Sequence, residues 1–235
     1  MPYFFYYGFD WTYLVIILPC LILSIWASTH VNSTFKKYSN QLSRRHITGA
    51  QAAQEVLNAN GVSGVRIERV SGNLTDHFDP KTNVIRLSDS VFDSTSTAAI
   101  GVACHEAGHA VQYAVHYAPM KIRAMIIPIT NIGSSLAMPL ILLGILFAAF
   151  EPLITVGILC FSLSVIFQLV TLPVEFNASR RAMMAIENAG ILTDDEQKGA
   201  RKTLTAAAMT YVAATIVAAA QLLRLILLFG RRRRN

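Results

Sequence analysis

The chain has 235 residues, of which 53% are hydrophobic and only 14% are charged. This composition excludes an ordinary soluble globular protein and indicates an integral membrane protein with room for one small water-facing domain. The net charge is +6, but the Lys and Arg residues cluster beside apolar runs. Such clustering is typical of membrane flanks and argues against nucleic-acid binding.

Four apolar segments predict transmembrane helices, at residues 11–28, 125–150, 153–172 and 206–229. The first is expected to be a retained anchor, because the residues before it carry no Lys or Arg and no small-residue cleavage site follows it. Trp11, Tyr13 and Trp26 are placed as interface aromatics. Only Glu151-Pro152 separates the second segment from the third, which predicts a tight helical hairpin.

Two helices are predicted between the first and second spans. The first covers residues 47–60, where Thr48 can cap the start and Gly61 can end the helix in a left-handed turn. The second is expected to begin after the serine-containing caps at 94–96 and to run to about Tyr117.

Two strands are predicted between these helices. Residues 65–70 alternate in polarity, residues 83–87 form a second short strand, and the turn-forming residues 76–80 lie between them. The pattern therefore predicts a β-hairpin. We expect the strand at 83–87 to be able to pair with an extended substrate by strand addition.

The segment after the third span predicts further helix. Pro173 is expected to open a new turn, and residues 175–188 then read as a helix that Gly190 stops. Residues 193–196 form a capping box with acidic residues, which predicts the start of a helix that continues into the fourth span.

The expected fold is mainly α, a helical membrane protein with about four transmembrane helices and a small α+β domain. Five parts are predicted. They are an amino-terminal anchor (1–29), a cytoplasmic α+β domain (30–122), a transmembrane hairpin (123–173), a cytoplasmic helix (174–204), and a last transmembrane helix with a basic tail (205–235).

The distribution of basic residues predicts the orientation in the membrane. Lys and Arg follow the first and third spans and precede the second and fourth, whereas the amino terminus and the turn at 151 carry none. The positive-inside bias puts the α+β domain and the 173–205 loop on the cytoplasmic side. The terminal residues 231–234 oppose this bias, since four full spans place that basic tail outside.

The motif His105-Glu106-Ala107-Gly108-His109 carries the strongest chemical signal. Within a helix, positions i and i+4 share one face, so both imidazoles can reach one metal ion. Glu106 is offset so that its carboxylate can hold a water against that ion and take its proton. The pattern predicts a zinc hydrolase. Cys104 is expected to be a small buried residue, and no pair of the three cysteines suggests a disulfide framework.

A catalytic zinc site requires a third protein ligand besides the two histidines. His116 follows His109 by seven residues, about 10 Å along a helix, which is too far to share one ion. A carboxylate from a separate helix is therefore expected. Glu175, at the cytoplasmic end of the third span, is the best choice, and Glu151 lies on the wrong side. Alternatives that stay open are Glu187, Asp194 and Asp195.

Several segments together resemble the bacterial membrane-bound neutral zinc metallopeptidases, along nearly the whole chain. These segments are residues 79–80, 84–88, 105–110 and 173–182. The resemblance implies a zinc-dependent endopeptidase in the bacterial cytoplasmic membrane, with a gluzincin-like domain and one Zn²⁺ per chain. In a broader group of membrane proteases with the same order of motifs, the Glu that matches Glu175 binds zinc.

The same resemblance puts the support of the ligand histidines in question. The broader group usually has an Asp four residues after the zinc-binding Glu, and this chain has Ser179 there. A hydroxyl supports an imidazole more weakly than a carboxylate does, and Asn177 is a residue that can compensate.

The predicted mechanism has His105, His109 and Glu175 hold the ion while Glu106 acts as general base. An additional donor is expected to stabilise the oxyanion, and the sequence does not choose among the candidates. These candidates are His77, Tyr113, Arg180 and Tyr211.

The alternative function is a non-catalytic membrane assembly or scaffold protein whose metal site is structural or vestigial. The intact Glu106 argues against it, because a structural site needs no general base. Expected partners are the lipid bilayer and peptide or protein substrates, including membrane proteins, and no nucleic acid. The sequence does not indicate which oligomeric state the protein adopts.

Overall fold

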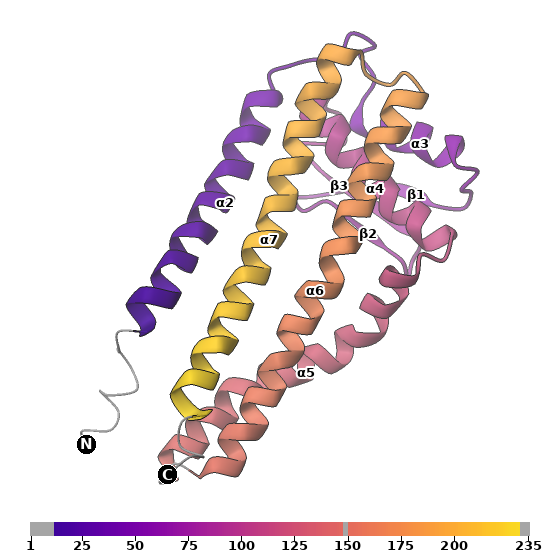
Figure 1. Cartoon of the computed structure of the whole chain (residues 1–235). Helices are drawn as coiled ribbons and strands as arrows, with labels where there is room; N and C mark the ends of the chain where they lie inside the picture. Colours follow the sequence, from indigo (N-terminus) through magenta and orange to yellow (C-terminus); the bar gives the residue numbers. More distant parts are fainter. Residues whose placement is uncertain (1–11, 148–149, 231–235) are drawn as a thin grey trace. The chain divides into compact units, whose positions relative to one another are not determined.

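The computed structural model describes residues 12–147 and 150–230 (Figure 1). It confirms the predicted fold class, since the chain is mainly helical with a small three-stranded sheet. Trp11 and the basic tail at 231–234 lie outside the described residues, so the predictions about them stay predictions.

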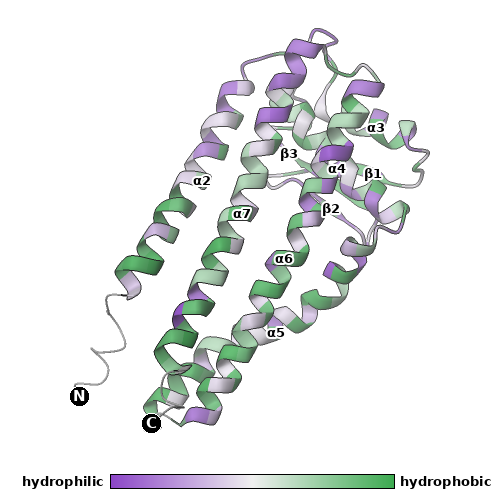
Figure 2. Cartoon of the chain, in the orientation of Figure 1, coloured by the Kyte–Doolittle hydropathy of each residue, from purple (hydrophilic) through white to green (hydrophobic). Residues whose placement is uncertain are grey.

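Four helices are long and apolar enough to cross a membrane. They are Tyr13–Tyr38, Ala118–Leu146, Glu151–Asn188 and Asp194–Phe229. The first consists of a π-helical turn, η1 (Tyr13–Ile17), followed by α2 (Leu18–Tyr38), and the other three belong to α5 (Ala118–Leu146), α6 (Glu151–Asn188) and α7 (Asp194–Gly230). Colouring by hydropathy shows that α2, α6 and α7 each change along their length from a polar end to an apolar part (Figure 2).

The chain divides into two compact units. Of the described residues, the apolar-helix unit contains those up to Ala27, those between Ile122 and Leu172, and those from Thr210 to Gly230. The α+β unit contains Ser28–Lys121 and Pro173–Met209. Within the apolar-helix unit, α5 and α6 approach closely at small residues. A methyl group on Gly157 would lie 2.9 Å from the carbonyl oxygen of Ala137. Small residues are what allow helix backbones to pack so closely in lipid.

The prediction that Pro173 opens a new turn is wrong, because α6 continues through Pro173 to Asn188. Proline removes one backbone donor, but a helix that emerges from an apolar span tolerates that loss where neighbouring groups satisfy the freed carbonyl. Glu175 therefore stands on the same continuous helix as the third span. The prediction that the last helix continues into the fourth span is confirmed by α7.

The helices predicted in the α+β unit are confirmed. Helix α3 (Gly49–Ala59) starts with a capping box between Thr48 and Gln51, and Gly61 beyond its end has a φ of 65°. Helix α4 (Thr97–Ala114) starts at Ser96, whose hydroxyl accepts a hydrogen bond from the amide of Ala99 at 3.2 Å. Both caps satisfy amide groups that have no partner inside the helix.

The sheet differs from the prediction. Strand β1 (Arg66–Val70) pairs in parallel with β3 (Val84–Ser88), and β2 (His77–Asp79), where a turn was predicted, pairs antiparallel with β3. The hairpin is therefore β2–β3. Asp79 closes its turn by accepting hydrogen bonds from the Thr82 hydroxyl and the Lys81 amide, and these hold the pKa of Asp79 at about 2, below its usual value.

This strand order also shows that the prediction of strand addition at residues 83–87 is wrong. The order is β1-β3-β2, so β3 is the central strand and its backbone groups are paired on both sides. A strand adds only to an unpaired edge. In the described sheet, the edges belong to β1 and β2.

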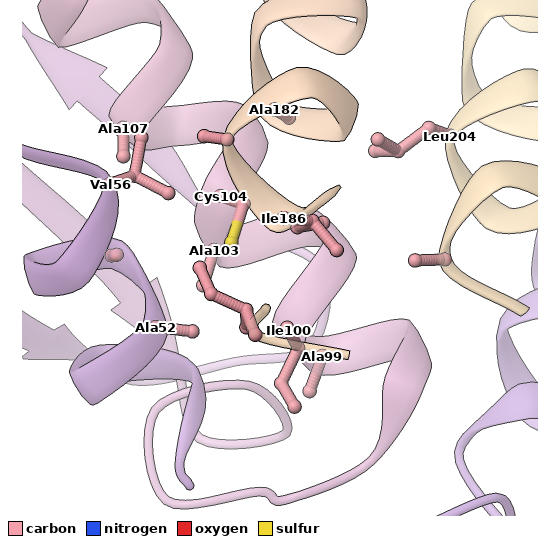
Figure 3. Packing of buried hydrophobic residues seen from close by; sticks show 14 of the residues in the cluster. Ala52, Val56, Ala99, Ile100, Ala103, Cys104, Ala107, Ala182, Ile186 and Leu204 are labelled. Carbon is pink, nitrogen blue, oxygen red and sulfur yellow. The ribbon is translucent and has the colours of Figure 1, made fainter. Parts of the chain in front are cut away.

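The core of the α+β unit brings together buried side chains from α3, α4, α6, α7 and β3, and α4 lies against the sheet (Figure 3). Its largest fully buried side chains include Leu57, Ile85, Ile100 and Ile186. Helix α4 packs almost backbone to backbone on its neighbours. A methyl group on Gly108 would lie 2.7 Å from the carbonyl oxygen of Ala178 in α6.

We predict that Gly108→Ala lowers the stability of the folded protein by about 1–3 kcal/mol, because the added methyl group forces α4 and α6 apart. Gly101→Ala is the matched control, since its methyl group would lie 3.2 Å from the Cα and Cβ of Ala200 and requires only a small shift. The measurement is the midpoint of thermal unfolding in detergent. Equal midpoints for the two variants would contradict the packing described.

Candidate metal centre

Three side chains of the α+β unit converge on one point. His105 and His109 lie one turn apart on α4, and Glu175 comes from α6. Glu175 Oε2 lies 3.3 Å from His105 Nε2 and 3.5 Å from His109 Nε2. The ligand atoms of the three residues all lie within 4.8 Å of one another, and the carboxylate of Glu175 is buried.

Ser179 holds the far side of the first imidazole. Its hydroxyl oxygen lies 3.1 Å from His105 Nδ1, because Ser179 follows Glu175 by one turn on α6 and therefore faces α4 as well. When the hydroxyl accepts a hydrogen bond from Nδ1, the lone pair of His105 is on Nε2 and faces Glu175.

Gln112 fixes the proton of the second imidazole. Arg181 Nε can only donate, so the Asn177 oxygen that lies 2.8 Å from it accepts. The amide nitrogen of Gln112 donates to the same Asn177 oxygen at 2.9 Å and to the carbonyl of Val174 at 2.8 Å. Gln112 Oε1 therefore faces His109 Nδ1, at 3.0 Å, and accepts its proton. The lone pair of His109 is then on Nε2, the atom that faces Glu175.

This arrangement turns three lone pairs toward one another, two from imidazoles and one from a carboxylate. Without a positive charge between them these groups repel, so the geometry fits a cation. Two imidazoles and one carboxylate form a donor set that zinc uses in catalytic sites, with a fourth position left for water. The residues present thus fit a zinc ion.

The local charges favour a cation in the same way. Burial by itself lowers the pKa of His109, yet hydrogen bonding to Glu175 and the negative charges of Glu106 and Glu175 raise it above the usual value. Two carboxylates beside two imidazoles leave a surplus of negative charge. Cys104 is fully buried, burial raises the pKa of its thiol, and its sulfur is not among the described ligand atoms that converge at this point.

Other carboxylates proposed from the sequence lie elsewhere in the fold. Glu187 lines a separate cavity between α6 and α7. Asp194 and Asp195 begin α7, where Asp195 pairs with Lys198 at 2.9 Å. Of these alternatives, Glu175 is the carboxylate that the structure brings to the two histidines.

The four oxyanion candidates have different surroundings. His77 is exposed on β2, and its Nδ1 lies 2.9 Å from the Thr75 carbonyl. Tyr113 is half-exposed on α4, with its ring centroid 5.9 Å from that of Phe78 on β2. Arg180 lines two surface cavities on α6. Tyr211 belongs to the apolar-helix unit, whereas the other three belong to the α+β unit.

Gln112 is the residue of this centre that the sequence analysis did not identify. It is fully buried, which is unusual for a glutamine and shows that its amide is satisfied inside the protein. The signal available in the sequence was its position three residues after His109, on the same side of the helix.

A family model described as "Putative neutral zinc metallopeptidase" matches residues 13–230, a range that includes His105, His109 and Glu175. Among curated proteins, the "Putative membrane protease YugP" of Bacillus subtilis (strain 168) is 44% identical over 217 residues. That alignment covers 92% of this chain and 96% of the relative. No solved structure matches the chain significantly. The family resemblance seen in the sequence is confirmed.

We predict that Gln112→Ala weakens zinc binding by about 10- to 100-fold, because it removes the group that orients His109. The measurement is competitive zinc titration of the full-length protein in detergent. Gln54→Ala is the matched control, since Gln54 is an exposed glutamine on α3 that hydrogen-bonds Asn58. If both variants bind zinc as the unchanged protein does, Gln112 has no such role.

Proposed function

Because the chain belongs to the neutral zinc metallopeptidase family, we propose that it is a membrane-anchored zinc-dependent endopeptidase with Glu106 as general base. The observation that supports this most strongly is the convergence of two imidazole lone pairs on a buried carboxylate beside a further buried glutamate. A site that only held a metal for structural reasons would have no use for that additional glutamate.

His105, His109 and Glu175 would hold the zinc ion through Nε2, Nε2 and a carboxylate oxygen. When bound, the ion supplies Lewis acidity that makes a water nucleophilic at neutral pH and polarises a carbonyl. The protein's contribution is to keep the three donor atoms in place. Ser179 and Gln112 do so by fixing the outer nitrogen of each imidazole.

Glu106 moves the proton in the proposed reaction. Its side chain is buried next to His105 in the sequence of α4, and its negative charge raises the pKa of His109, which supports this role. The carboxylate takes a proton from the attacking water as the new C–O bond forms at the scissile carbonyl. It then gives that proton to the leaving amine as the C–N bond breaks, so that it ends as it began.

Tyr113 is the oxyanion donor that we favour. It follows His109 by four residues on α4 and therefore lies on the same face of the helix, one turn further along. Its ring packs against Phe78, and its side chain is accessible to solvent and to a substrate. His77, Arg180 and Tyr211 have no comparable relation to the motif.

We predict that Tyr113→Phe lowers kcat about 10²-fold or more and leaves zinc content unchanged, because the ring still packs on Phe78 while the hydroxyl donor is lost. The measurement is peptide hydrolysis together with zinc per chain. Tyr117→Phe, a few residues further along the chain, is the matched control. An unchanged kcat for Tyr113→Phe would assign the donor to another residue.

We place the protein in the bacterial cytoplasmic membrane with its centre on the cytoplasmic side. Support comes from the four apolar helices and from the basic residues at their polar ends. Glu175 follows Leu172, the last residue of the apolar part of α6, by only three positions on one helix. We therefore propose membrane proteins, or loops close to the membrane, as substrates.

We predict that Glu106→Gln retains zinc and loses peptide hydrolysis by about 10²- to 10⁴-fold, since only the proton-accepting group is removed. Glu175→Gln is expected to lose zinc as well as activity. The full-length protein in detergent is assayed for zinc per chain and for cleavage of an unstructured protein. Glu68→Gln, a change of a partly exposed glutamate on β1, serves as the control.

These measurements separate the proposed enzyme from the scaffold alternative. Zinc in the unchanged protein and in Glu106→Gln, with activity only in the former, supports the peptidase. Purified protein that binds no zinc, or hydrolysis that survives in Glu106→Gln, contradicts the proposed mechanism.

A further inference from the structure

A basic cavity lies within the α+β unit, away from the metal centre. It has a volume of about 610 Å³ and is lined by the last turns of α2 and the first turns of α7. The two helices meet where Tyr38 approaches the backbone of Gly199. Three of the lining side chains carry a permanent positive charge, Lys37, Arg201 and Lys202, and no carboxylate is among the residues that line the cavity.

These charges are available for binding. Lys37, Arg201 and Lys202 are all exposed, and among the described residues Arg201 and Lys202 form no ion pair. Lys37 lies over the ring of Tyr38, with its nitrogen 5.5 Å from the ring centroid. Three like charges around one cavity repel one another, and an anion bound in the cavity offsets that repulsion because it attracts all three.

The hydroxyl of Thr34 adds a directed donor. Thr34 lines the cavity, and within the described part of the chain no residue hydrogen-bonds its hydroxyl. This oxygen is not among the buried polar atoms that lack a partner, so it is open to the cavity and to a ligand there. A phosphate oxygen is an acceptor that such a hydroxyl and the neighbouring cations bind together.

The position along the helices identifies the source of the phosphate. Ser33 and Thr205 both line the cavity. Ser33 lies five residues after the first apolar segment ends at 28, and Thr205 directly precedes the fourth apolar segment, which begins at 206. These separations correspond to roughly 10 Å or less along a helix axis. The headgroup layer on each side of the hydrocarbon core has a similar depth, about 5–8 Å.

We propose that this cavity binds the phosphate headgroup of an acidic phospholipid. The positive-inside bias accounts for Lys and Arg near cytoplasmic helix ends, but it does not account for the convergence of three of them, without a carboxylate, on one cavity that a threonine hydroxyl also lines. Basic pockets between helices at the cytoplasmic surface recognise anionic headgroups through these same groups. The proposal is independent of the peptidase activity.

The test compares full-length protein with a variant carrying Lys37→Gln, Arg201→Gln and Lys202→Gln. The matched control carries Lys36→Gln, Lys81→Gln and Lys121→Gln, which removes the same charge at exposed positions that do not line the cavity. Binding is measured in nanodiscs of phosphatidylcholine containing graded phosphatidylglycerol, by native mass spectrometry of retained lipid. A second arm adds inorganic phosphate to protein in neutral detergent.

We expect phosphatidylglycerol to bind the unchanged protein and the control with the same affinity. We expect it to bind the cavity variant on the order of 100-fold more weakly, because each of the three basic groups raises the affinity for an acidic lipid roughly fivefold. Equal retention by the cavity variant and the control overturns the proposal. So does occupancy by inorganic phosphate at millimolar concentration without any preference for the lipid. If the cavity variant does not fold, Thr34→Val replaces it, since this change removes only the hydroxyl donor of the cavity. Unchanged lipid retention by Thr34→Val then overturns the proposal.

Discussion

The backbone of α4 touches that of α6 at Gly108, and this contact sets the geometry of the metal centre. A methyl group there would lie 2.7 Å from the Ala178 carbonyl oxygen, so no residue with a Cβ fits without separating the helices. Gly108 lies between the two histidines of the motif, and Ala178 lies one turn from Glu175. The close approach is therefore what lets a carboxylate on one helix reach two imidazoles on the other.

The two histidines are oriented by different hydrogen bonds to their Nδ1 atoms, which point away from Glu175. His105 is held by a single hydroxyl, Ser179, whereas His109 is held through Gln112 by a network that includes Asn177, Val174 and Arg181. The network is fully buried at Gln112, where hydrogen bonds are strong and an unpaired group is costly. A neutral amide thus orients His109, and it adds no further negative charge to the centre.

Much of this structure follows from local patterns in the sequence. The apolar runs, the caps at Thr48 and Ser96, and the spacing of His105 and His109 each depend on residues close together in the chain, and all of these elements are present. The sheet order was missed because parallel pairing of β1 with β3 depends on tertiary packing, and alternating polarity does not distinguish it from a hairpin. The role of Gln112 was missed for a similar reason, since its partners come from another helix.

The order of the three metal-centre side chains along the chain has a consequence for biosynthesis. Residues 105 and 109 are translated first, then all of α5 and the apolar part of α6, and only afterwards residue 175. A nascent polypeptide interrupted before that point carries two imidazoles but lacks the carboxylate. The complete donor set cannot form until the ribosome has made both helices of the intervening hairpin, so chains that lack the hairpin also lack the third donor of the centre.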